Sequence, residues 1–104
     1  MLFKIHRKGN VVILLLVVSF LPYIFHAQSC FQRACRFYQS KQYDSAWVQF
    51  NHELKHNPSA ETHYNAGNAA YKLKKTGWAI LHYKSALKIK PGFQNAFDNL
   101  QLAY

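Results

Sequence analysis

The chain has 104 residues, half of them hydrophobic, and a formal net charge of +9. This length suits one small domain, and the apolar content is enough for a folded core, which argues against several domains and against a disordered chain. The excess of Lys and Arg favours an anionic partner, either a membrane surface or an acidic protein segment.

Residues 1–27 have the pattern of a secretory signal. Lys4, Arg7 and Lys8 come before an uncharged, mostly apolar run, VVILLLVVSFLPYIF. We predict that this segment exports the chain and is cleaved after Ala27. The run is shorter than the roughly twenty apolar residues of a typical membrane span, which favours cleavage, and an uncleaved membrane anchor is the alternative.

Both cysteines, Cys30 and Cys35, stand near the start of residues 28–104, which we predict to be the folded domain. Residues five apart on a helix point in different directions, so a disulfide requires the helix to begin after Cys30. Two half-buried thiols are the simpler interpretation. Ser29-Cys30 also resembles the end of a bacterial lipoprotein signal, so a lipid attached to Cys30 is a further alternative to cleavage.

Residues 28–58 predict a helical hairpin. The turn is expected at Lys41 to Tyr43, and Asp44 follows in the first turn of the second helix, where the exposed amides favour a carboxylate. Asn57-Pro58 is a typical end for that helix.

Residues 60–91 predict a second hairpin, because small and aromatic residues recur at helical spacing on both sides of a Lys-Lys-Thr-Gly cluster. The facing positions are Ala66, Gly67 and Ala70 on the first helix, and Ala79, Tyr83 and Ala86 on the second. A glycine in mid-helix costs roughly 1 kcal/mol relative to alanine. Gly67 is therefore expected where a neighbouring backbone or ring comes close.

The two hairpins repeat at a fixed offset: Ala46, Phe50 and Pro58 precede Ala79, Tyr83 and Pro91 by 33 residues each. The second copy, which begins at Ala60, resembles a tetratricopeptide repeat. Its stretches YNAGNAAYKL and AILHYKSALKIKPG, with NAFDNLQLA after them, are also similar to the repeat segment of BatE-like aerotolerance proteins of Bacteroidetes bacteria. The resemblance implies an all-α fold made of two tetratricopeptide-type helical hairpins.

The last residues, 93–104, match the first helix of a third repeat, with Phe97, Leu100 and Tyr104 at its apolar positions. A lone helix of this type caps a repeat array by covering its last hydrophobic face. We therefore predict helices near residues 30–40, 43–56, 60–73, 77–89 and 93–104.

No residue pattern predicts catalysis, since the sequence has no phosphate-binding glycine loop and no nucleophile beside a base. His52 and His56 stand four apart on one predicted helix, but two ligands alone do not close a metal site. We expect no enzyme activity, no cofactor and no bound metal. Nucleic acid is not expected as a partner either, because an exported protein seldom meets it.

The resemblance implies a groove lined by the first helix of each repeat. Its candidate partner-binding residues are Tyr38, Tyr64, Asn65, Asn68, Tyr71, Lys72 and Asn99. Asparagine both donates and accepts hydrogen bonds, and tyrosine adds contact area with a polar tip, which suits capture of a peptide. The alternative is that Asn65 and Asn68 only join neighbouring helices. The family's carboxylate clamp is not expected, because Tyr64 and Asn99 stand at two of its positions.

The sequence thus predicts a protein-interaction module of the cell envelope that binds an extended or helical segment of a partner. A second copy of the chain, covering the exposed end of the short array, is another predicted partner. The alternative function is a membrane-associated structural protein, with residues 1–27 as its anchor and the lysines of residues 84–90 against anionic lipid.

Overall fold

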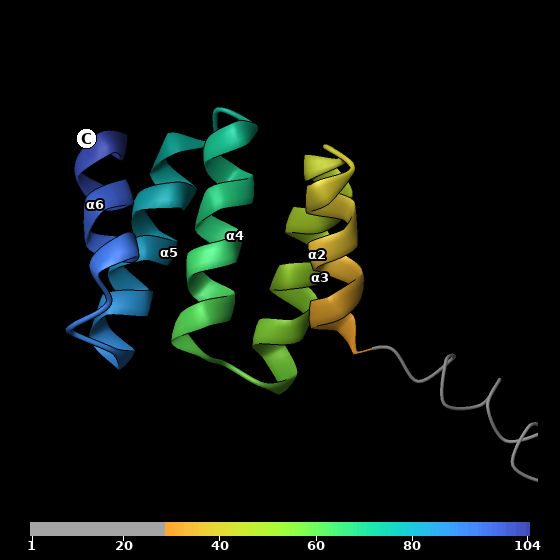
Figure 1. The fold of residues 1–104 in the computed structure, drawn as a ribbon, viewed down its shortest axis with the longest axis horizontal. Helices are drawn as coiled ribbons and strands as arrows, with labels where there is room; N and C mark the ends of the chain where they lie inside the picture. Colours follow the sequence, from red (N-terminus) through yellow and green to blue (C-terminus); the bar gives the residue numbers. More distant parts are fainter. Residues whose placement is uncertain (1–28) are drawn as a thin grey trace, which may run out of the picture.

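The computed structural model describes residues 29–104; the predicted export segment and its cleavage site lie outside these residues. The described part is all-α, with helices α2 (Cys30–Gln39), α3 (Tyr43–His56), α4 (Ala60–Lys72), α5 (Thr76–Ile89) and α6 (Gln94–Ala103) (Figure 1). This confirms the predicted fold of two helical hairpins and one final helix, and every predicted helix end lies within one residue of the observed one. None of the described helices is long and apolar enough to cross a membrane.

The first helix of each hairpin begins at a serine cap. The Ser29 hydroxyl accepts a hydrogen bond from the Gln32 amide at 3.2 Å, and the Ser59 hydroxyl accepts one from the Thr62 amide at 3.1 Å. Each bond satisfies an amide that has no partner within the helix itself. The caps therefore define where α2 and α4 start.

Both hairpin turns contain a lysine in the left-handed conformation, Lys41 with φ 61° and Lys74 with φ 60°. At each turn the next amide bonds back to a carbonyl five residues earlier, Gln42 to Phe37 at 2.8 Å and Lys75 to Ala70 at 2.9 Å. This pairing is the Schellman arrangement that ends many helices. The helix break therefore lies at Lys74, whereas Gly77 of the predicted break lies inside the first turn of α5.

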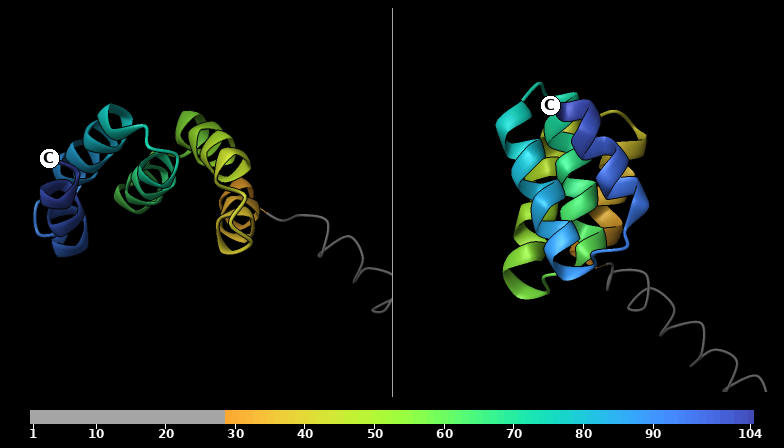
Figure 2. Two further views of the ribbon diagram at one scale, coloured as in Figure 1. Left: turned by 90° about the horizontal axis from the view of Figure 1, so that it is seen from above. Right: turned by 90° about the vertical axis from the view of Figure 1, so that its left-hand side faces the viewer.

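The helices form a short array with two sides. Seen from above, α2, α4 and α6 lie along one side, and α3 and α5 lie along the other (Figure 2). Helix α4 packs against α3, α5 and α6. The first helix of each repeat, which the resemblance predicts to line a groove, thus lies on the side formed by α2, α4 and α6.

The core consists mainly of the small residues that the sequence places on facing helix sides. Ala66, Ala70, Ala79 and Ala86 are fully buried, and Tyr83 fills the space between the hairpin helices with 1% of its surface exposed. An ideal Cβ on Gly67 would lie 2.6 Å from Cε1 of Tyr83. The glycine is therefore required by the approach of this ring, as predicted.

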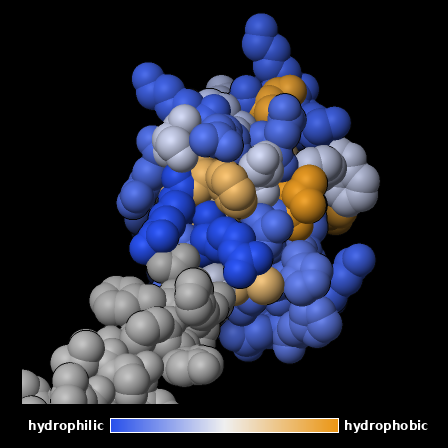
Figure 3. All heavy atoms as spheres, turned by 90° about the vertical axis from the view of Figure 1, so that its right-hand side faces the viewer, coloured by the Kyte–Doolittle hydropathy of each residue, from blue (hydrophilic) through white to orange (hydrophobic). Residues whose placement is uncertain are grey.

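The two ends of the array differ in character. Where no grey atoms cover it, the end at α2 is mostly hydrophilic, with a few hydrophobic side chains (Figure 3). The helix at the other end, α6, packs Ala96 and Leu100 inward and leaves Phe97, Leu102 and Tyr104 exposed. The apolar end of the described array is thus the one at α6.

Candidate functional site

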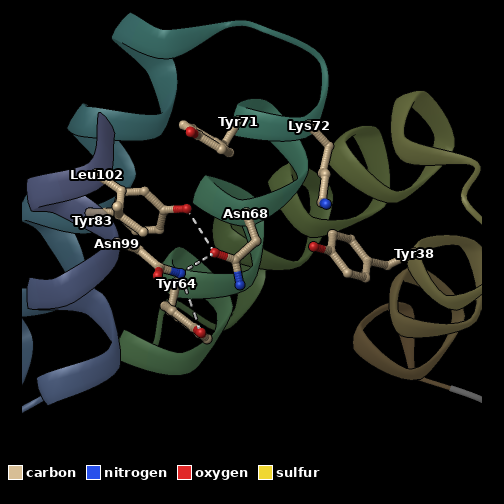
Figure 4. A pocket seen from close by; sticks show the side chains of 8 residues that line it. All are labelled: Tyr38, Tyr64, Asn68, Tyr71, Lys72, Tyr83, Asn99 and Leu102. Atoms are coloured by element: carbon tan, nitrogen blue, oxygen red, sulfur yellow. Dashed lines mark hydrogen bonds between the residues drawn. The ribbon is translucent and has the colours of Figure 1, made fainter. Parts of the chain in front are cut away.

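A pocket of about 270 Å³ lies beside α4, between α2 and α6 (Figure 4). It is lined by Tyr38 of α2, by Tyr64, Asn68, Tyr71 and Lys72 of α4, by Tyr83 of α5, and by Asn99 and Leu102 of α6. Three of the four α4 residues follow one another at four-residue spacing, which puts Tyr64, Asn68 and Lys72 on one face of the helix. Of the eight lining residues, only Lys72 is charged.

The side chain of Asn68 is the centre of the polar network in this pocket. Its Oδ1 accepts a hydrogen bond from the Tyr83 hydroxyl at 2.7 Å and another from Nδ2 of Asn99 at 2.9 Å. Two donors on one oxygen determine which way the amide faces. The Nδ2 group of Asn68 lies on the side away from both donors (Figure 4). A hydrogen-bond donor is therefore presented to the pocket.

Tyr83 supports this network from the core. Its burial raises the pKa of the phenol above the ordinary value, so the hydroxyl stays a neutral donor. The equivalent position in the first hairpin is Phe50, 33 residues earlier, which lacks the hydroxyl. This difference between the two copies is the sequence signal for the polar role of Tyr83, for which the helical pattern predicts packing alone.

Six of the seven predicted partner-binding residues line the pocket; the exception is Asn65. Asn65 directly follows Tyr64 on α4, so the helix turns it away from the face that carries Tyr64, Asn68 and Lys72. Tyr83 and Leu102 line the pocket without having been predicted. Leu102 had no signal beyond its place on the final helix.

Tyrosine rings form much of the wall of the pocket. The Tyr38 ring packs edge-on against Tyr43, with centroids 5.2 Å apart, and burial raises the pKa of Tyr38. Lys72 reaches across the same region, with its Nζ 6.0 Å from the centroid of the Tyr43 ring. Aromatic surface with polar tips and one cation therefore surrounds the Asn68 donor.

The alternative role for Asn68, joining helices, is also visible. Its Oδ1 connects α4 to α5 through Tyr83 and to α6 through Asn99. Within residues 29–104, however, its Nδ2 group donates no hydrogen bond to another protein group, and both hydrogen bonds of the side chain are made by Oδ1. One end of the amide thus holds the helices together, while the other faces the pocket.

The cysteines and the histidines on α3 form no closed site. Cys30 and Cys35 are free thiols, and Sγ of Cys30 lies 3.3 Å from Nδ1 of His52. The ring centroids of His52 and His56 lie 4.9 Å apart. Within the described part of the chain, no three His, Cys, Asp or Glu side chains gather where they could hold a metal ion.

A second polar cluster, which the sequence did not predict, joins α4 to α5 through two histidines. Nδ1 of His63 lies 3.2 Å from Nδ1 of His82, which is 6% exposed. Burial, together with the nearby His63, lowers the pKa of His82 to about 4. Nε2 of His82 is buried without a protein partner. This pair is therefore held neutral in the folded state at neutral pH.

The α4–α5 hairpin, which carries most of the residues that line the pocket, matches a known family of repeats. Residues 60–93 match the model of the tetratricopeptide repeat, and no curated protein matches the chain. The match begins at Ala60, where the sequence predicts the repeat to start, and it spans α4 and α5. The α2–α3 hairpin, recognised by its 33-residue offset, lies outside the match.

Proposed function

Because residues 60–93 form a tetratricopeptide repeat, a motif of protein-protein interaction, we propose that this chain holds an extended segment of a partner protein in the pocket beside α4. The observation that supports this site best is the Asn68 amide. Its oxygen is used inside the protein, and its nitrogen is left to face the pocket.

The pocket offers what an extended peptide needs. A backbone carbonyl of the peptide accepts a hydrogen bond from Nδ2 of Asn68. This bond replaces the one that Nδ2 makes to water in the free protein. The rings of Tyr38, Tyr64 and Tyr71 supply apolar area for its side chains at low cost in conformational entropy. Lys72 favours a segment with a carboxylate near the bound carbonyl.

We place this activity in the cell envelope. The support is the basic start and apolar run of residues 1–27 and the similarity of YNAGNAAYKL to BatE-like proteins, both of which are features of the sequence. N-terminal sequencing of the protein from cells tests the location. A chain that begins at Gln28 supports export and cleavage, and a full-length chain recovered in the cytosol contradicts both.

The binding experiment uses Asn68→Asp. An aspartate keeps an oxygen to accept from Tyr83 and Asn99, but it replaces the donor that faces the pocket with a second acceptor. Truncation to alanine is less informative, because it also leaves the buried Tyr83 hydroxyl without its partner. Asn51→Asp on α3 is the matched control, since it changes the charge equally and lies outside the pocket.

Partners are captured from envelope extracts with the parent chain and with both variants. Loss of one hydrogen bond costs about 1 kcal/mol, so Asn68→Asp is expected to reduce recovery about five-fold, whereas Asn51→Asp leaves it unchanged. Circular dichroism and thermal melting check that both variants are folded. A folded Asn68→Asp variant that recovers the same partners in the same amounts shows that this pocket is not the site.

A further inference from the structure

The positive charge of the described part is concentrated in its second repeat. Residues 62–97 contain no Asp or Glu. They contain six lysines, all of them exposed: Lys72, Lys74, Lys75, Lys84, Lys88 and Lys90. Lys72 belongs to the pocket beside α4, and the others surround α5 and its two ends. The proposed peptide site gives no role to the five lysines other than Lys72.

The outer face of α5 is also unusually apolar for a surface helix. Trp78, Leu81 and Ile89 are 51%, 52% and 53% exposed. Together with the half-buried Ser85, which lies between Leu81 and Ile89, they are spaced three, four and four residues apart along the chain. This spacing puts them in one stripe along the helix. Lys84 and Lys88 lie one turn apart beside it. We call these exposed apolar residues and the two lysines the α5 ridge.

The tryptophan at the start of the ridge is held in place before any partner arrives. Its ring packs edge-on against Trp47 of α3, with centroids 6.0 Å apart and an interplanar angle of 64°. Nζ of Lys75 lies 5.1 Å from the centroid of the Trp47 ring, within the range of a cation–π contact. Half of the Trp78 surface nevertheless stays exposed to solvent.

The ridge lies on the opposite side of the array from the pocket. Helix α5 is on the side shared with α3, whereas α2, α4 and α6 form the pocket side (Figure 2). The two surfaces can therefore be occupied at the same time.

We propose that the α5 ridge docks on an anionic lipid surface. Trp78, Leu81 and Ile89 enter the boundary between head groups and acyl chains, and Lys84 and Lys88 lie against the lipid phosphates. Exposed Trp and aliphatic residues beside lysines are typical of helices that lie in a membrane interface. The absence of any carboxylate from residues 62–97 removes the repulsion that an anionic surface otherwise meets.

The chemistry of the ridge favours lipid over an acidic protein. The indole N–H of Trp78 is the one neutral hydrogen-bond donor among the side chains of the ridge. Ser85, which lies between the apolar residues, donates to the carbonyl of Leu81 on its own helix at 2.9 Å. The ridge therefore offers charge and apolar area with little directional hydrogen bonding. A fluid surface of phosphates and acyl chains needs nothing more, whereas protein interfaces usually carry directional hydrogen bonds as well.

The chain contains two tryptophans, Trp78 on the ridge and the half-buried Trp47 packed against it, so tryptophan fluorescence reports on the ridge. The full chain is mixed with phosphatidylcholine vesicles, with or without phosphatidylglycerol, whose acyl chains carry bromine as a quencher. We expect a blue shift and quenching of tryptophan emission with the anionic vesicles only. Insertion of the apolar residues 11–25 alone does not produce this pattern, since that segment contains no tryptophan.

Three variants test the assignment. Each lysine near an anionic membrane contributes roughly a five-fold factor in affinity, so Lys84→Gln/Lys88→Gln is expected to shift the quenching titration to about 25-fold more lipid. Arg33→Gln/Arg36→Gln, on the exposed surface of α2, removes the same charge and is expected to change it less than about two-fold at moderate salt. Leu81→Gln, at an exposed position, weakens quenching without changing the helical content.

Two results overturn the proposal. Equal weakening by the lysine and arginine pairs shows that only net charge matters and that the ridge is not the contact surface. Emission that responds to soluble polyglutamate, but is not quenched by the brominated anionic vesicles, assigns the ridge to an acidic protein. The peptide pocket is unaffected by either result, because none of these substitutions lies in its lining.

Discussion

Substitution of Gly67 by alanine tests the packing on which the second hairpin depends. A Cβ at this position would lie 2.6 Å from Cε1 and 2.8 Å from Cδ1 of the Tyr83 ring, closer than carbon atoms approach without repulsion. The ring has no room to retreat, because it is buried in the core and its hydroxyl is bonded to Asn68. The methyl group therefore pushes the two helices apart or breaks that hydrogen bond.

The expected size of the effect follows from two opposing contributions. Alanine gains up to about 1 kcal/mol of helix propensity over glycine. Overpacking a core costs roughly 1 to 3 kcal/mol, and loss of the bond between Tyr83 and Asn68 adds about 1 kcal/mol. We expect Gly67→Ala to lower the free energy of unfolding by about 1 to 3 kcal/mol, and the bulkier Gly67→Val to lower it further. For a domain of this size each kcal/mol lowers the melting temperature by about 4 to 8 °C.

The assay is thermal and urea unfolding followed by circular dichroism, with Gly77→Ala as the matched control. Gly77 is also helical, but a Cβ added there meets nothing within 4 Å, so alanine is expected to be neutral or slightly stabilising. If the melting temperature of Gly67→Ala equals that of Gly77→Ala and is not below that of the parent, α4 and α5 do not approach closely at this point.

Three further predictions follow from single groups. In the unfolded chain His82 takes up a proton near its ordinary pKa of 6.5, whereas in the folded chain its pKa is about 4. The free energy of unfolding is therefore expected to fall by up to about 3 kcal/mol as the pH is lowered from 6.5 to 4, as measured by urea unfolding. His82→Phe is expected to flatten this pH dependence. Lys74→Gly removes a side chain from the left-handed conformation. This substitution is expected to raise the free energy of unfolding by up to about 1 kcal/mol, seen as a higher melting temperature. Tyr83→Phe deletes the hydroxyl bonded to Asn68 and is expected to cost about 1 kcal/mol in urea unfolding; no loss of stability would contradict a net contribution from that bond.

The sequence was sufficient for the helices because local signals and the repeat period agree. The 33-residue offset aligns Ala46 with Ala79 and Phe50 with Tyr83, and all four side chains are buried. The turn at Lys74 was less visible, because a lysine in the left-handed conformation leaves no mark in composition. The Schellman bonds that stabilise it join backbone groups, which any residue carries.

The pocket was predicted through the resemblance to the tetratricopeptide repeat, which implies a groove along the first helix of each repeat. The spacing of Tyr64, Asn68 and Lys72 is enough by itself to place them on one helix face. The orientation of the Asn68 amide depends on partners 15 and 31 residues away in the chain, Tyr83 and Asn99. Such contacts arise when three helices meet, so no local pattern announces them. The histidine pair between α4 and α5 was missed for the same reason.

The core and the pocket are linked through one side chain, which makes a final prediction possible. Gly67 leaves the space that the Tyr83 ring fills, and the Tyr83 hydroxyl in turn holds the Asn68 oxygen, so that the amide nitrogen faces the pocket. Gly67→Ala, which replaces no lining residue, is therefore expected to weaken partner capture even at temperatures where the variant is fully folded. Gly77→Ala leaves capture unchanged. If folded Gly67→Ala captures partners as the parent does, the orientation of the Asn68 amide does not depend on Tyr83, and binding and hairpin packing are independent.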